Sequence, residues 1–182
     1  GNTNATAEHT LALILSLIRK IPYSNYTTQI GKWEKKNIKG TELSNKILGI
    51  IGFGNVAIRL TELVKGFDMN IQVYSNSLIK RQKEFPEIKN IKLEELISTS
   101  DIITLHCKTT LDGKPLINYE QLSKMKPSAI IINTARGNII NENDLNLALN
   151  ENLISGAAID VFSKEPANEN ILFNNSKVIL TP

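Results

Sequence analysis

The sequence predicts an α/β fold in which a doubly wound parallel sheet carries helices on both faces. Short apolar runs alternate with amphipathic stretches along the 182 residues, as in chains built of βαβ units. Several runs are continuous, which is typical of strands buried on both faces. The length fits one domain spanning residues 1–182, with enough interior to fold without disulfides.

Apolar spacing and helix breakers place the helices. We expect a first helix over residues 5–20, stopped by Pro22, and a more polar second one over residues 23–35. A third helix follows the first strand, with Gly66 where a helix cap would lie. The expected later helical segments are residues 55–65 (that third helix), 93–97, 119–125 and 143–150.

The strands are expected where apolar residues run together. The run at residues 129–133 is the richest in β-branched side chains, which favour strands. The full set of expected strands is residues 46–51, 69–74, 88–92, 101–106, 129–133, 156–162 and 178–181.

Composition excludes several classes of protein. Lysine and arginine number 21 against 18 acidic residues, a net charge of +3, which argues against a dedicated nucleic-acid or membrane-surface binder. Cys107, the one cysteine, cannot form an intramolecular disulfide, and no cysteine–histidine cluster has metal-site spacing. The apolar run at residues 11–18 is too short to span a membrane, so we expect a cytoplasmic protein.

A glycine-rich turn, GFGNVA at residues 52–57, joins the first strand to its helix. Gly52 permits a tight turn, and Gly54, lacking a side chain, lets the backbone approach a pyrophosphate. Free amides and the positive dipole end at the helix start then bind the anion. The alternative is an ordinary turn between strand and helix, but the surrounding α/β pattern favours a Rossmann-like dinucleotide site.

The end of the second strand bears on the choice of coenzyme. NAD sites commonly have an acid there that binds the ribose hydroxyls, whereas this chain has Ser75. Ser75 would not repel the 2′-phosphate of NADP, and Lys80 or Arg81 could pair with it; alternatively, these two lie in a solvated loop. We expect NAD and leave NADP open.

With these features in place, the chain resembles the D-isomer-specific 2-hydroxyacid dehydrogenases, a family that includes D-3-phosphoglycerate, D-lactate and formate dehydrogenases and glyoxylate/hydroxypyruvate reductases. The matching motifs keep the family's order across nearly the whole chain. They are AEH at residues 7–9, the glycine turn, His106, MKP at 125–127, NTARG at 133–137, GAAIDVF at 156–162, EP at 165–166 and TP at 181–182.

The resemblance implies catalytic roles for two residues. Arg136 would bind the substrate carboxylate and polarise its carbonyl, as a planar fork of donors can. Glu165 would hold the catalytic histidine and favour its charged form. That histidine would follow Pro182 and is missing from this sequence, and we expect His9 to be a packed or surface side chain instead. The isolated chain should therefore bind coenzyme with little turnover.

The resemblance also implies coenzyme contacts. The backbones of Asn55 and Val56 would meet the pyrophosphate, Thr134 and Ala135 would lie near the nicotinamide, and His106 would end a strand at the coenzyme edge. Asp160 interrupts an apolar strand, where an unpaired carboxylate is costly to bury. Its partner is either the nicotinamide carboxamide or a neighbouring loop.

One departure from the family pattern is Lys108, in place of a proline; it either adds a cation near the cleft or points to solvent. We expect a domain excised from a longer two-domain enzyme, without its substrate domain, acting on a small 2-hydroxy or 2-oxo acid such as D-3-phosphoglycerate. A homodimer formed through the first two helices is implied as well. The alternative is a non-catalytic, corepressor-like module that senses dinucleotide.

Overall fold

The computed structural model describes residues 2–182 and contains a single seven-stranded, all-parallel sheet. Its order is β3-β2-β1-β4-β5-β6-β7, which confirms the predicted doubly wound α/β fold. The strands are β1 (Ile47–Ile51), β2 (Asn70–Tyr74), β3 (Lys89–Asn90), β4 (Ile102–Leu105), β5 (Ile130–Asn133), β6 (Gly156–Ile159) and β7 (Val178–Leu180).

The strand order reverses direction between β1 and β4. β1 pairs on one side with β2, Leu48 opposite Ile71, and on the other with β4, Leu48 opposite Ile102. The connections from these two strands leave toward opposite sides, so a crevice opens beyond their carboxyl ends. Ligands of open α/β sheets bind at such a point.

Alternating residues of the strands supply two cores, one on each face. In β5, Ile131 belongs to one core cluster, while Ile130 and Ile132 belong to the other. Burial on both faces explains why these strands have continuous apolar runs.

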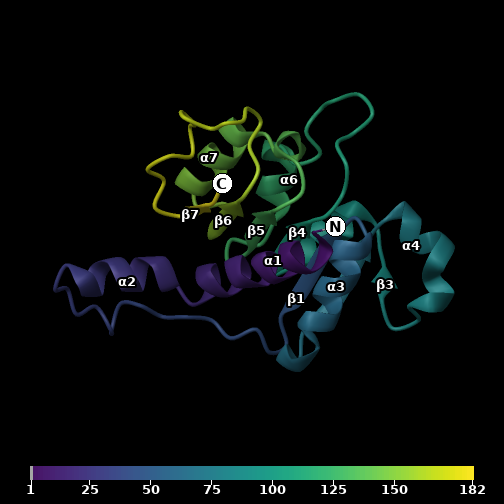
Figure 1. Cartoon of the computed structure of the whole chain (residues 1–182), viewed down its shortest axis with the longest axis horizontal. Helices are drawn as coiled ribbons and strands as arrows, with labels where there is room; N and C mark the ends of the chain where they lie inside the picture. The colour runs from purple at the N-terminus through teal and green to yellow at the C-terminus, as the bar shows by residue number, and fades with distance from the viewer. Residues whose placement is uncertain (1) are drawn as a thin grey trace.

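The helices divide between the two faces accordingly. On one face α1 (Thr3–Ile18) packs along α3 (Asn55–Leu63), and both lie in front of the sheet in Figure 1. On the other face lie α5 (Leu93–Thr99), α6 (Tyr119–Lys124) and α7 (Glu142–Asn150). The structure also has α2 (Ile21–Gln29), α4 (Asn76–Arg81) and three short 3-10 helices, η1 (Lys65–Phe67), η2 (Gln82–Glu84) and η3 (Gly137–Ile139).

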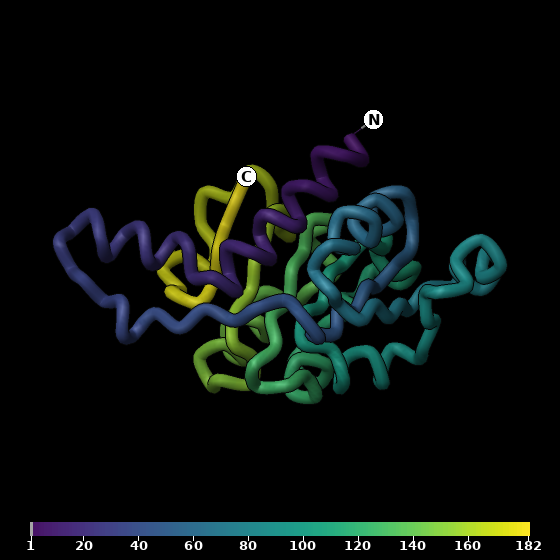
Figure 2. Tube along the Cα trace, turned by 90° about the horizontal axis from the view of Figure 1, so that it is seen from below, coloured from purple at the N-terminus to yellow at the C-terminus, as the bar shows by residue number. Residues whose placement is uncertain are grey.

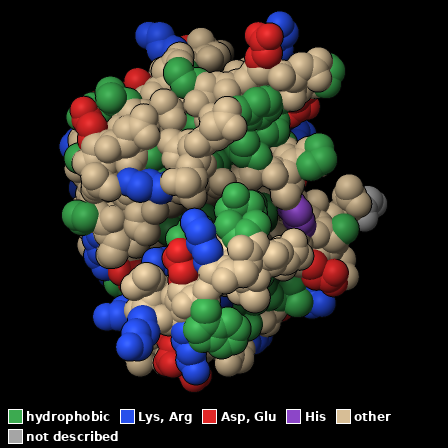
Figure 3. All heavy atoms as spheres, turned by 90° about the vertical axis from the view of Figure 1, so that its left-hand side faces the viewer, with side chains coloured by type: hydrophobic (Ala, Val, Ile, Leu, Met, Phe, Trp, Pro, Cys, Tyr) green, Lys and Arg blue, Asp and Glu red, His purple; other side chains and the backbone are tan. Residues whose placement is uncertain are grey.

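The second helix, α2, projects from the body of the domain (Figure 1). The chain then returns beneath α1 to the start of β1 as a long irregular segment, which is clear in Figure 2. Exposed apolar side chains are concentrated in α2 and this return; they are Ile21, Tyr23, Tyr26, Ile30 and Trp33, the last 81% exposed. Figure 3 views this end of the molecule and shows hydrophobic side chains at several places on its surface.

Three local expectations were wrong. The second helix ends at Gln29, not at residue 35, because Gly31 takes a left-handed conformation (φ +77°). Gly66 is not the cap of α3; it lies inside η1, and the left-handed residue that ends this segment is Asp68 (φ 53°). Pro22 does not stop the first helix, which ends at Ile18; it lies in the first turn of α2. Of the readings left open for Lys80 and Arg81, the loop is not present, because both residues belong to the short helix α4.

Within residues 2–182, none of the helices combines the length and apolar character needed to cross a bilayer.

Candidate functional site

The structure places the predicted site residues at the carboxyl edge of the sheet. Each follows a different strand: the glycine turn follows β1, Ser75 follows β2, His106 follows β4, the turn at residues 134–136 follows β5, and Asp160 follows β6. Parallel pairing brings these ends together although the residues are far apart in the sequence. Three cavities along this edge share several lining residues.

Gly52 makes the first turn possible. Its φ is +90°, and a Cβ on it would lie 2.6 Å from the carbonyl oxygen of His106. Its N–H donates to the carbonyl of Tyr74 (2.9 Å). Both the left-handed backbone and the close approach require glycine, so this turn is fixed against the ends of β2 and β4.

Gly54 has a different reason to be glycine. Its backbone is ordinary and extended (φ −97°, ψ −168°), and a Cβ would meet no atom within 4 Å. No protein atom therefore fills the space where a side chain at position 54 would lie.

Beside that space, the N–H groups of Asn55 and Val56 begin the nine-residue helix α3 and have no acceptor among residues 2–182. The first amides of a helix have no partner within it, and they carry its positive dipole end. Open space beside unpaired amides fits the pyrophosphate of a dinucleotide.

Next to α3, a cavity of about 260 Å³ is lined by Val56, His106, Lys108, Thr134, Ala135 and Arg136, among others. The Nε2 atom of His106 is buried and has no hydrogen-bond partner among the described residues. Burial lowers the pKa of His106 to about 4, so the ring is uncharged at neutral pH. Cys107 beside it is half-buried, and burial raises the pKa of its thiol.

The turn after β5 is held by Asn133, which is 1% exposed. The N–H of Ala135 donates to Asn133 Oδ1 (3.1 Å), and Asn133 Nδ2 donates to the carbonyl of Arg136 (2.9 Å). Thr134 is joined to α1 by a 2.9 Å bond to Thr10. Thr134 is the donor there, because the Thr10 hydroxyl already donates to the carbonyl of Thr6.

Arg136 and Glu165 line one cavity of about 430 Å³. Arg136 is exposed and forms no ion pair within residues 2–182; its Nη1 donates to the carbonyl of Ala135 (2.6 Å). A Cβ on Gly137 would lie 1.8 Å from the carbonyl oxygen of Phe162. The absence of a side chain on Gly137 therefore lets the turn after β5 contact the loop after β6.

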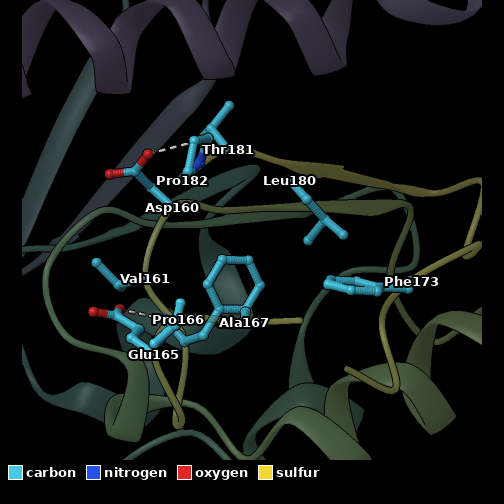
Figure 4. A pocket seen from close by; sticks show the side chains of 10 residues that line it. Asp160, Val161, Glu165, Pro166, Ala167, Phe173, Leu180, Thr181 and Pro182 are labelled. Carbon is cyan, nitrogen blue, oxygen red and sulfur yellow. Dashed lines mark hydrogen bonds between the residues drawn. The ribbon is translucent and has the colours of Figure 1, made fainter. Parts of the chain in front are cut away.

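The loop that carries Glu165 is fixed by acidic side chains. Glu165 Oε1 accepts from the N–H of Phe162 (2.9 Å). Glu142, in the first turn of α7, accepts from the N–H and hydroxyl of Ser163 (2.8 and 2.7 Å) and from Asn170 Nδ2 (2.9 Å). The same loop borders a cavity of about 450 Å³ that is lined by both Asp160 and Glu165, Asp160 above Glu165 in the view of Figure 4.

Asp160 has protein partners. Its Oδ1 lies 3.0 Å from His9 Nε2 and accepts from the Thr181 hydroxyl (2.6 Å). Asp160 is therefore hydrogen-bonded within the protein. Its partners come from α1 and from the residue after β7, not from a single neighbouring loop. His9 is a partly exposed side chain, as expected, and its ring is hydrogen-bonded to Asp160 and Thr181.

Ser75 lies apart from these cavities. It is 8% exposed, its hydroxyl is 2.9 Å from that of Ser77, and it borders a separate cavity of about 620 Å³ with Lys89 and Lys92. Ser77 donates to the carbonyl of Phe53 (3.2 Å), so the turn after β2 is tied to the glycine turn.

The guanidinium of Arg81 already has partners within the protein. Its Nη2 lies 2.9 Å from Glu84 Oε2, and its guanidinium stacks on the ring of Phe85 at 5.1 Å.

Sequence reasoning missed Asn133 and Glu142 as supports of the site. A signal existed for Asn133, because a polar residue ends the most β-branched run, just as Asp160 ends another. Glu142 had no such signal, because an acid in the first turn of a helix is common. Among residues 2–182 no three His, Cys, Asp or Glu side chains lie close enough together to hold a metal ion.

These features define a Rossmann-type domain with a candidate nucleotide site at the carboxyl edge of its sheet. The family described as D-isomer specific 2-hydroxyacid dehydrogenase, NAD binding domain, matches residues 11–182. The chain belongs to this family, which confirms the resemblance of its motifs.

Relatives of known activity agree with that assignment. The chain is 41% identical to a D-3-phosphoglycerate dehydrogenase of Synechocystis over 182 residues, covering all of this chain and 33% of that protein. It is 36% identical to a glyoxylate reductase of Pyrococcus furiosus, covering 99% of this chain and 56% of that protein. The chain thus spans between a third and somewhat over half of these relatives' length.

Solved structures show the same fold with coenzymes bound. An NAD-dependent formate dehydrogenase from Staphylococcus aureus in complex with NAD superposes with a TM-score of 0.90 at 30% identity, covering 99% of this chain and 54% of that one. An acyclic imino acid reductase in complex with NADPH and D-Arg gives 0.87 at 31%, covering 100% and 57%.

The burial of His106 predicts a pH-dependent stability. An unfolded imidazole takes up a proton near pH 6.5, whereas the folded one does so only at about 4. Between these values the unfolded state binds more protons, so acidification favours unfolding. As pH falls from 6.5 to 4, the wild type should lose ~3 kcal/mol of unfolding free energy relative to His106→Gln, measured by urea denaturation. Parallel pH profiles of the two proteins would contradict this.

Proposed function

We propose that residues 1–182 form the coenzyme domain of a longer oxidoreductase that interconverts D-2-hydroxy acids and 2-oxo acids. The observation that carries the proposal is the turn after β1, where the unpaired amides of Asn55 and Val56 border the open space at Gly54. Family membership and the partial coverage of the relatives support the wider role.

The residues of the turn after β5 suit substrate binding. A nicotinamide coenzyme bound at this edge would supply hydride transfer to or from the carbon that carries the hydroxyl. Arg136, exposed and without an acidic partner, binds the substrate carboxylate and polarises the 2-oxo group through its planar donors. This cation is the feature that favours an enzyme over a purely sensing module.

The proton of the hydroxyl needs a base, and neither histidine of the chain is suited to that role. His9 is bonded to Asp160, and His106 is buried with a pKa of about 4. Neither lines the cavity of Arg136 and Glu165. We infer that Glu165 supports a histidine supplied from outside residues 1–182, and that this chain alone binds coenzyme with little turnover.

The substrate is a small 2-hydroxy or 2-oxo acid, and D-3-phosphoglycerate is one candidate because a relative of that activity is 41% identical. The backbones of Thr134 and Ala135 border the cavity beside α3, as a contact with the nicotinamide requires. His106 lines the same cavity, and Ser75 lies at the end of β2, where the adenosine ribose would bind.

Replacing Gly54 tests coenzyme binding directly. Gly54→Val should leave the thermal midpoint near that of the wild type, because the protein has no atom within 4 Å of the new Cβ. It should weaken NAD binding at least about tenfold, ~1.4 kcal/mol, because the side chain fills the place of the pyrophosphate. Isothermal titration calorimetry measures the affinity. Gly66→Val, with equally open space but remote from the edge, is the matched control; equal affinities of both variants and the wild type would refute the site.

Comparing coenzymes tests the choice between NAD and NADP. We propose a preference for NAD, since Arg81 is paired with Glu84 and stacked on Phe85 and is not free for a 2′-phosphate. Calorimetry should give the tighter binding for NAD, and Lys80→Ala should not change the ratio. Tighter binding of NADP would show that the lack of an acid at Ser75 governs selectivity.

We also propose that the chain forms a homodimer through α2 and the return segment, whose apolar side chains are exposed in the single chain. Sedimentation velocity should give twice the 20.2 kDa of one chain, and Trp33→Asp should shift the equilibrium toward monomer. A wild-type monomer at high protein concentration would contradict the proposal, and Leu111→Asp, an exposed position on a distant loop, is the control.

A further inference from the structure

We propose that His9 is a positioning residue for the coenzyme: with Thr181 it occupies one oxygen of Asp160, so that the other oxygen is presented to the nicotinamide carboxamide. This inference rests on the proposed function. His9 lies on α1, Asp160 follows β6, and Thr181 follows β7. Three elements that are distant in the sequence thus meet at one carboxylate oxygen.

The contacts form a closed triangle. His9 Nε2 lies 3.0 Å from Asp160 Oδ1 and 3.1 Å from the Thr181 hydroxyl, which itself lies 2.6 Å from Asp160 Oδ1. Figure 4 shows Asp160 and Thr181 side by side beneath α1. The backbones are also fixed, because Asp160 N–H donates to Asn133 and Thr181 N–H donates to Ile159 (3.0 and 3.1 Å).

The donors and acceptors can be assigned from chemistry. An ionised carboxylate only accepts, so Thr181 donates its hydroxyl hydrogen to Asp160. The Nε2 of His9 must then carry a hydrogen, which it shares between Asp160 Oδ1 and the lone pair of Thr181. Two donors on Oδ1 leave Oδ2 with no partner among residues 2–182.

The free oxygen is suited to an amide. Asp160 is 23% exposed in its side chain, and it borders the cavity that runs toward Glu165. A carboxamide N–H₂ is the donor that a half-buried carboxylate oxygen needs. With Oδ1 held, the carboxylate keeps one rotamer, and less conformational freedom is lost when the coenzyme binds.

The test separates the nicotinamide from the rest of the coenzyme. His9→Ala should weaken binding of NAD about tenfold and leave binding of ADP-ribose, which lacks the nicotinamide, unchanged in calorimetry. His9→Gln should restore most of the loss, because a glutamine amide can donate to Asp160. Thr181→Val, which keeps the shape and removes the hydroxyl, should act in the same direction as His9→Ala.

A merely structural role gives a different pattern. Equal weakening of NAD and ADP-ribose by His9→Ala would overturn the proposal, and so would unchanged affinity for both.

A second measurement needs no coenzyme. NMR three-bond couplings should report one χ1 rotamer of Asp160 in the wild type and in His9→Gln, and averaging in His9→Ala. If the wild type bound neither NAD nor ADP-ribose, the proposed function would fail while these couplings still decided the role of His9. Identical couplings in the wild type and His9→Ala would overturn the positioning role of His9.

Discussion

The unpaired amides where β1 gives way to α3 are the constraint on which the site depends. The first N–H groups of a helix have no acceptor within that helix. Here no protein atom fills the space beside Gly54 either, so these amides stay free for a ligand. The left-handed backbone of Gly52 brings this turn against the end of β4. Parallel pairing then aligns the ends of β5 and β6 with it, which places Arg136 and Asp160 along the same edge.

The loops that carry Arg136 and Glu165 are held by hydrogen bonds from polar side chains. Asn133 closes the turn before Arg136, and Glu142 fixes the loop that carries Glu165. Bonds of this kind restrict loops that would otherwise be mobile, so a ligand bound there would meet a geometry that is already set. Arg136 differs, since its backbone is fixed while its guanidinium remains exposed and without an acidic partner, as a group that binds an external carboxylate should be.

The fold could be predicted because its determinants are local. Continuous apolar runs gave β1, β4 and β5 within one or two residues, and the glycine turn was recognisable from the strand before it and the helix after it. The short polar helix α4 was missed, since it lacks an apolar period long enough to detect. For Asp160 the unusual carboxylate was visible, but its partner His9 is 151 positions away, and no local pattern encodes such a pairing. The support from Glu142 was hidden because an acid in the first turn of a helix is common.

We propose that the amides of Asn55 and Val56 bind the pyrophosphate of the coenzyme. Amide chemical shifts followed by NMR during titration with ADP, which carries a diphosphate but no nicotinamide, test it most directly. The largest shifts should fall on Gly54, Asn55 and Val56, while amides on the remote η1 segment stay in place. Saturable binding of ADP that left these three amides unmoved in a folded domain would contradict it.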